Sequence, residues 1–84
     1  MKYRKKPVVI EAFQLGVDEV PEWAWSRRNE DITFIFGTMP QLIIKTLEGS
    51  MTANYEDYII KGIKNEIYSC KPEIFNETYE AENE

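Results

Sequence analysis

The sequence contains no histidine and only one cysteine, Cys70, among its 84 residues. Without these side chains the chain cannot build a Cys/His zinc site, a histidine-ligated haem, a Ser-His-Asp triad or an internal disulfide. No cofactor is therefore expected, and the groups left for catalysis are carboxylates and one thiol. These absences predict a protein that is not an enzyme.

Long apolar runs are missing as well. The basic start of the chain resembles that of a signal peptide, but only Val8-Val9-Ile10 follows before Glu11, whereas a cleavable signal needs about 7 to 15 apolar residues. A membrane span needs about 20. We therefore expect no membrane partner and a cytoplasmic location, which agrees with a lone unpaired thiol.

The charge is acidic overall and unevenly placed. Ten Lys or Arg against fifteen Asp or Glu give a net charge of −5, which disfavours nucleic-acid binding because that binding depends on neutralising phosphates. We expect a single domain over residues 1–84, with a solvated basic arm at 1–6 and a frayed acidic tail at 80–84.

The apolar pattern and the turn residues predict several short strands and two short helices. The predicted strands cover residues 8–14, 32–36, 42–47, 50–53, 57–62 and 66–70. The predicted helices cover about 21–29 and a short segment opened by Pro72, in which Phe75 and Tyr79 lie one turn apart. Strands joined by tight turns pair antiparallel. The fold class is therefore α+β: a small, mostly antiparallel, curled sheet of five or six strands packed against two helices, with partial barrel closure as an alternative.

One hairpin register follows from the sequence if Lys64-Asn65 is a two-residue turn, for which Asn65 suits a left-handed φ. That turn pairs Ile63 with Glu66, Lys61 with Tyr68, and Ile59 with Cys70 on one face. A face that carries isoleucines beside Lys61 is expected to be half covered, either by a helix or by another copy of the chain.

Two tryptophans in the first predicted helix should point in different directions. At 100° per residue, Trp25 lies about 160° around the helix from Trp23. Trp25, with Arg28 beside it, is the leading partner-binding candidate because exposed Trp is enriched among interface anchors. The alternative is a partly covered aromatic beneath the loop 18–20 or the N-terminal arm.

Five tyrosines are many for a chain of this length. Tyr58 and Tyr68 are further partner-binding candidates, because tyrosine suits surfaces that are apolar beneath and polar at the tip. Lys61, Tyr68 and Lys71 are candidates for binding a ligand, by stacking on a base or holding a phosphate. Ordinary packing at the sheet edges is the alternative for all of them.

Cys70 and the acids are the remaining reactive groups. A thiolate near Lys71 and a helix start would have a lowered pKa, although buried and unreactive cysteine is commoner. No spacing singles out a catalytic pair of carboxylates. Asp57 is expected to end a turn by bonding the backbone, and with Glu56 it lacks the ligand-dense loop that calcium requires, so no metal site is predicted.

Three stretches of the sequence match a common pattern. They are Arg4-Lys5-Lys6-Pro7-Val8-Val9-Ile10-Glu11-Ala12, then Thr46-Leu47-Glu48-Gly49 with Met51, and Asp57-Tyr58-Ile59-Ile60-Lys61-Gly62-Ile63-Lys64 running on through Tyr68, Cys70-Lys71-Pro72, Ile74-Phe75 and Thr78-Tyr79-Glu80. The chain resembles small proteins encoded in many tailed bacteriophages and prophages, a group that implies no particular activity. The group often has Pro-Gly where this chain has Tyr55-Glu56, and Lys-Gly-Glu where it has Lys64-Asn65-Glu66. Glu in place of Gly at position 56 argues against a positive φ there.

The resemblance implies production inside a bacterial host, in its cytoplasm, and an accessory role. We therefore predict a non-catalytic phage accessory protein that binds a host or defence protein. Two alternatives stay open. One is an oligomer that binds or sequesters a nucleotide-like small molecule at the seam between its subunits. The other is a structural or assembly component of the virion.

Overall fold

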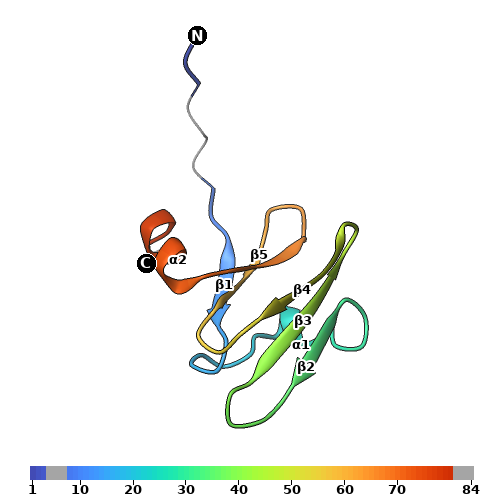
Figure 1. The fold of residues 1–84 in the computed structure, drawn as a ribbon. Coiled ribbons are helices and arrows are strands. Elements are labelled where there is room, and N and C mark those ends of the chain that lie inside the picture. The colour runs from blue at the N-terminus through green and yellow to red at the C-terminus, as the bar shows by residue number, and fades with distance from the viewer. Residues whose placement is uncertain (4–7, 81–84) are drawn as a thin grey trace.

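Six strands and two helices form the fold in residues 1–3 and 8–80, the part of the chain that the computed structural model describes (Figure 1). In chain order they are β1 Glu11–Gln14, α1 Glu22–Trp25, β2 Ile32–Ile35, β3 Gln41–Thr46, β4 Gly49–Ala53, β5 Tyr58–Lys61, β6 Ile67–Cys70 and α2 Pro72–Thr78. Residues 4–6 of the predicted basic arm and 81–84 of the predicted acidic tail lie outside the described residues.

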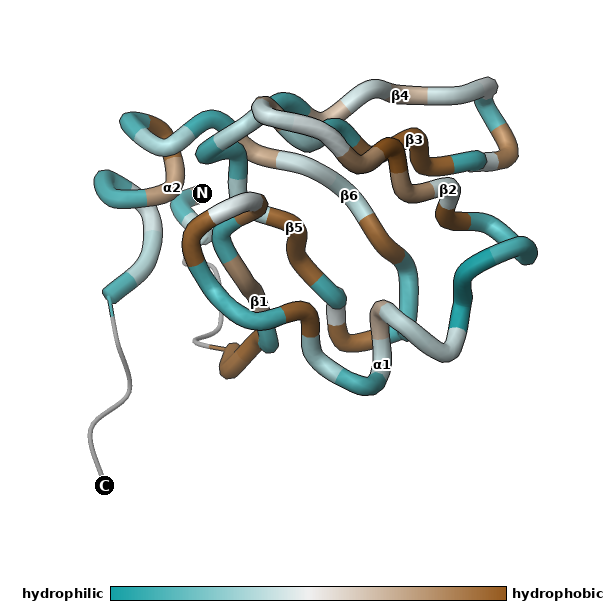
Figure 2. The backbone as a smooth tube through the Cα atoms, turned by 90° about the horizontal axis from the view of Figure 1, so that it is seen from below, coloured by the Kyte–Doolittle hydropathy of each residue, from teal (hydrophilic) through white to brown (hydrophobic). Residues whose placement is uncertain are grey.

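The strands divide into two antiparallel sheets of three, with the strand orders β1-β5-β6 and β2-β3-β4. The predicted α+β class with antiparallel strands and two short helices is confirmed. The strands form two sheets where we expected one curled sheet, and the sheets do not close into a barrel. The chain crosses between them because β5 returns from the second sheet to pair with β1, as Figure 2 shows from below.

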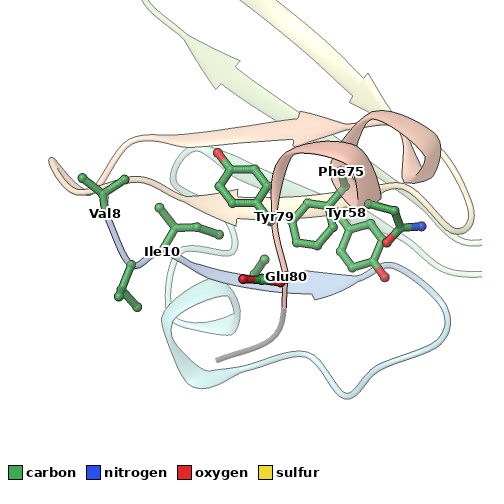
Figure 3. Close-up of a pocket in the computed structure, with 9 residues that line it drawn as sticks. Val8, Ile10, Tyr58, Phe75, Tyr79 and Glu80 are labelled. Carbon is green, nitrogen blue, oxygen red and sulfur yellow. The ribbon is translucent and has the colours of Figure 1, made fainter. Parts of the chain in front are cut away.

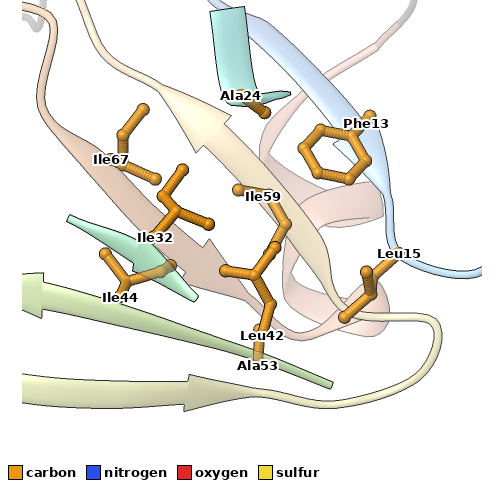
Figure 4. Close-up of a cluster of buried hydrophobic side chains, with 9 residues drawn as sticks. All are labelled: Phe13, Leu15, Ala24, Ile32, Leu42, Ile44, Ala53, Ile59 and Ile67. Atoms are coloured by element: carbon orange, nitrogen blue, oxygen red, sulfur yellow. The ribbon is translucent and has the colours of Figure 1, made fainter. Parts of the chain in front are cut away.

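The core lies between the two sheets and is built by alternate residues of the strands (Figure 4). Strand side chains alternate between the two faces of a sheet, so one face of each sheet supplies the core. Its members are Phe13, Leu15, Ala24, Ile32, Leu42, Ile44, Ala53, Ile59 and Ile67. Ala24 from α1 joins them, which fixes this short helix against the sheets.

The second helix covers the outer face of sheet β1-β5-β6. The ring of Phe75 stacks on that of Tyr58 at a centroid distance of 3.8 Å, and Tyr79 lies 5.0 Å from Phe75. Ile60 is fully buried on this face although it is not part of the central core. The predicted packing of Phe75 with Tyr79, one turn apart, is therefore present.

The register of the β5–β6 hairpin differs by one residue from our prediction. Lys61 pairs with Ile67, and Ile60 pairs with Tyr68. The Gly62 N–H donates to the Glu66 carbonyl and the Asn65 N–H donates to the Gly62 carbonyl, so the loop contains three residues and not two. Asn65 takes the left-handed conformation expected of it, with a φ of 68°. Because side chains alternate, this shift places Tyr68 and Lys61 on opposite faces of the sheet.

Two elements are shorter than predicted. The first strand begins at Glu11 and not at Val8, because its partner β5 ends at Lys61, the residue that pairs with Glu11. The first helix ends at Trp25 and not near Asn29. Asn29 has a φ of 68° and its N–H donates to the Ile32 carbonyl, so the chain turns there into β2.

Glu56 adopts a φ of 75°, contrary to our expectation. Its N–H donates to the Leu15 carbonyl at 2.8 Å, and its carbonyl accepts a hydrogen bond from the Gln14 side-chain amide at 3.1 Å. These bonds hold the turn before β5 in a conformation that glycine adopts without steric cost. The neighbouring contacts, and not the residue type, therefore determine the backbone here.

We expect the substitution Glu56→Gly to stabilise the protein by about 0.5 to 1 kcal/mol. Relief of the left-handed conformation is worth about 1 to 2 kcal/mol, and the greater freedom of glycine in the unfolded chain offsets about 0.4 to 1 kcal/mol of it. The melting temperature, followed by circular dichroism, should rise by about 2 to 8 °C. Glu19→Gly is the control, because Glu19 is exposed with an ordinary φ and its replacement should lower the melting temperature. A lower melting temperature for Glu56→Gly would contradict this account.

Candidate functional site

An exposed aromatic cluster lies at the outer edge of sheet β2-β3-β4. We call it the edge cluster, and it consists of Trp25, Arg28, Phe34 and Phe36. The ring centroids of Trp25 and Phe34 are 5.4 Å apart, and those of Phe34 and Phe36 are 6.0 Å apart with nearly parallel planes. Phe34 and Phe36 share one side of the chain because they are two residues apart in an extended segment.

The end of α1 positions the cation of this cluster. Arg28 Nη1 donates to the Trp25 carbonyl at 3.0 Å, and its guanidinium carbon lies 4.6 Å from the centre of the Trp25 ring. The backbone of Arg28 also bridges to Ile32, which brings the helix end beside β2. Arg28 therefore both satisfies a carbonyl at the helix end and holds a positive charge over an aromatic face.

The turn behind the cluster is fixed by a second arginine. Arg27 donates two hydrogen bonds to Asp31 and a third to the Asn65 carbonyl at 2.7 Å, which ties this turn to the β5–β6 loop. The hydrogen bonds from Arg27 lower the pKa of Asp31. The backbone that carries Trp25 and Arg28 is thus anchored from both sides.

Exposure increases along the edge cluster from the core to its rim. Phe34 is half-buried and packs against the core, Trp25 is 37% exposed, and Phe36 is 73% exposed. A supported aromatic surface with a fixed cation suits an apolar or aromatic side chain accompanied by a carboxylate. The cluster is thus an exposed aromatic surface that carries one fixed cation.

The two tryptophans point in different directions, as their helical spacing predicts. Trp23 packs edge-on against Phe13 at 5.7 Å, beside the core, whereas Trp25 faces the edge cluster. Trp25 packs on Phe34 of β2, a cover that we had not considered. Phe34 and Phe36 were missed, although their alternate spacing in a predicted strand was a signal that they share one side.

Tyr58 and Tyr68 lie on the outer face of sheet β1-β5-β6, away from the edge cluster. Tyr58 is covered by Phe75. Burial, together with a hydrogen bond and charge interaction with Tyr79, raises the pKa of Tyr68 to about 12. Tyr58 thus packs against α2, and Tyr68 lies beside Tyr79, the residue that follows this helix.

The proposed ligand-binding trio of Lys61, Tyr68 and Lys71 does not come together within one chain. The register places Lys61 on the face opposite Tyr68, where its ammonium pairs with Glu11 at 2.6 Å and lies 5.6 Å from the Trp23 ring. Lys71 pairs with Asp57 at 3.1 Å. Both cations are thus engaged by carboxylates of the protein itself.

Cys70 is less acidic than our sequence argument supposed. Burial raises the pKa of its thiol, and the negative charge of Asp57 raises it further. Its Sγ donates to the Lys71 carbonyl at 3.6 Å. Lys71 does not lower the pKa of the Cys70 thiol as we expected, because its ammonium is paired with Asp57.

The raised pKa of Tyr68 predicts a loss of stability in alkali. A group whose pKa rises on folding stabilises the folded state below its unfolded pKa, and that contribution is lost as the pH rises through the folded value. The window therefore runs from about pH 10, the ordinary tyrosine value, to about pH 12. Melting temperatures measured across this range should fall, and the fall should be smaller in Tyr68→Phe. An equal fall in the variant would show that other groups cause it.

Comparisons with known proteins give no relative from which a function could be transferred. No protein-family model, curated protein or solved structure matches the chain. Neither helix in residues 1–3 and 8–80 is long and apolar enough to cross a bilayer. Function must therefore be argued from the geometry of the chain itself.

Proposed function

We propose that the protein is a non-catalytic binding protein that docks on another protein through the edge cluster. The observation that carries the proposal is an aromatic surface, 37% exposed at Trp25 and 73% exposed at Phe36, with the Arg28 guanidinium held over it. Large exposed aromatic side chains next to an arginine are the residues enriched at the energetic centres of protein interfaces. Patches of this kind on small proteins mark interaction sites.

The resemblance to phage-encoded proteins indicates the class of partner. We propose an accessory role inside a bacterial host, in which the partner is a host or defence protein. The edge cluster also favours a particular chemistry in the partner, because the positive charge of Arg28 is best matched by a negative charge on the other protein. We expect the partner to present an apolar or aromatic side chain beside an Asp or Glu.

The substitution Trp25→Ala tests this proposal. The partner is first captured from host lysate and identified by mass spectrometry, and its purified form is then titrated in a calorimeter. We expect the dissociation constant to rise by about 30-fold or more, because interface tryptophans commonly contribute about 2 kcal/mol or more. The melting temperature should stay within a few degrees, since Trp25 lies outside the core cluster.

Leu47→Ala is the matched control. Leu47 is a fully exposed apolar residue that lies at the β3–β4 turn and is not part of the edge cluster. Its replacement should leave the affinity unchanged. Equal affinity of wild type and Trp25→Ala for the captured partner would remove the edge cluster as the binding surface.

A further inference from the structure

An apolar groove runs beside β1, on the side of the molecule away from the edge cluster (Figure 3). We call it the β1 groove. It consists of two adjoining hollows that share the lining residues Val8, Ile10 and Tyr79. The first has a volume of about 420 Å³ and is also lined by Ala12, Tyr58 and Phe75. The second has a volume of about 500 Å³ and is also lined by Tyr68. Val9 is 69% exposed next to it. Apolar side chains ahead of a strand are thus left uncovered along this groove.

Among the described residues, β1 is an edge strand that pairs only with β5. The Leu15 N–H donates to the Asp57 carbonyl, which shows that odd-numbered residues of β1 direct their backbone groups toward β5. Even-numbered residues therefore direct theirs outward. Gln14 is already occupied, because its N–H donates to Asp18 and its carbonyl accepts from the loop that follows. Within β1 the open edge is therefore at Ala12, and Ile10 and Val8 precede the strand.

This edge is complementary to itself. When residues 8–12 of two chains run antiparallel about a two-fold axis at Ile10, Val8 of one chain lies opposite Ala12 of the other, and the two Ile10 residues face each other. All three are even-numbered, so their outward N–H and C=O groups meet in pairs. Such pairing joins sheet β1-β5-β6 of one copy to the same sheet of the other copy. The result is a single sheet of six strands in which the edge at β1 is covered.

Charge complementarity points to the same occupant. The helix α2, which borders the groove, carries Glu73 and Glu77 four residues apart on one side of the helix, and Glu80 follows after the helix has ended. The residues ahead of Val8 are basic in sequence, with Lys2, Arg4, Lys5 and Lys6. The basic sequence ahead of Val8 and the acidic residues of α2 are opposite in charge, so two copies attract each other along this side of the molecule.

We propose that the β1 groove is the interface of a homodimer, in which residues 8–12 of two copies pair antiparallel and the basic N-terminal sequence of one copy complements the acidic α2 of the other in charge. The interface buries the groove-lining residues Val8 and Ile10, and it satisfies the outward backbone groups of Ile10 and Ala12. This inference does not depend on the function proposed above, because the edge cluster belongs to the other sheet.

Proline substitutions separate this interface from a general effect on the chain. Sedimentation equilibrium at about 100 µM should give twice the chain mass of 9.9 kDa for the wild type. Ile10→Pro removes an outward N–H and should give the single mass, whereas Val9→Pro removes an N–H that is not directed at the second copy and should leave the dimer intact. Charge reversal of Glu73, Glu77 and Glu80 to lysine should raise the dimer dissociation constant by about tenfold or more at low salt.

Hydrogen exchange tests the register directly, independently of any variant. In the dimer the amides of Ile10 and Ala12 should exchange slowly and that of Val9 rapidly, and dilution should speed the exchange of the first two. Phe13, which is bonded to β5, should stay protected at every concentration. A monomeric wild type, a dimer that survives Ile10→Pro, or exchange of Ile10 and Ala12 that does not depend on concentration would each overturn the proposal.

Discussion

Replacing Ile59 with alanine is expected to lower the free energy of unfolding by about 2 to 5 kcal/mol. Ile59 lies in the middle of β5, the central strand of sheet β1-β5-β6, between Phe13 and Ser69. Its side chain is fully buried in the cluster that both sheets share. A chain of this length has a total stability of only roughly 4 to 12 kcal/mol, so this single change should remove a substantial part of it.

The loss is measured by urea unfolding followed through tryptophan fluorescence, since Trp23 packs against the same cluster. Ile63→Ala is the control, because this substitution removes the same number of carbon atoms from an exposed site in the β5–β6 loop. It should change the free energy of unfolding by less than about 0.5 kcal/mol. A comparable loss for both variants would mean that the core does not lie where the two sheets meet.

The strands could be predicted from the sequence because their signals are local. Alternating apolar residues and turn residues located the six strands to within a few residues, and the turn preference of Asn65 was correct. The division into two sheets could not be predicted in the same way. It depends on β5 pairing with β1, for example Ile59 with Phe13. That pairing joins segments far apart in the chain, and no local pattern specifies it.

The hairpin shows how a small local error removed a predicted site. Our register assumed a two-residue turn, whereas Gly62 and Glu66 close a loop of three residues. A shift of one residue exchanges the two faces of a strand. Tyr68 therefore lies on the outer face beside Tyr79, and Lys61 lies on the core side next to Glu11. The ligand-binding trio failed because its geometry depended entirely on that register.

The edge cluster could be predicted from the sequence only in part. Helical periodicity correctly separated the directions of Trp23 and Trp25, although α1 contains a single turn. The packing of Trp25 on Phe34 is a contact between elements, so the spacing within the helix carried no information about it. A positive φ at Glu56 was missed for a similar reason, because bonds to Leu15 and Gln14 impose it.

Asp57 is the one buried charged residue among the described residues, with only 4% of its surface exposed. Its carboxylate accepts hydrogen bonds from the Asn54 N–H at 2.9 Å and from the Lys71 ammonium at 3.1 and 3.3 Å. The predicted role of Asp57 in ending a turn by bonding the backbone is thus present. The same carboxylate also joins the turn before β5 to the residue that precedes α2.

We expect Asp57→Ala to lower the free energy of unfolding by about 1.5 to 3 kcal/mol, because it removes the buried acceptor of the part-buried hydrogen bond from the Asn54 N–H. Lys71→Ala should cost less than about 1 kcal/mol, since the lysine side chain is 57% exposed and the ion pair is largely screened by water. Asp57→Asn retains an oxygen that can accept the Asn54 N–H and should fall between the two. Urea unfolding at neutral pH measures all three. Equal losses for Asp57→Ala and Lys71→Ala would show that the ion pair, and not the bond to the turn backbone, is the stabilising contact.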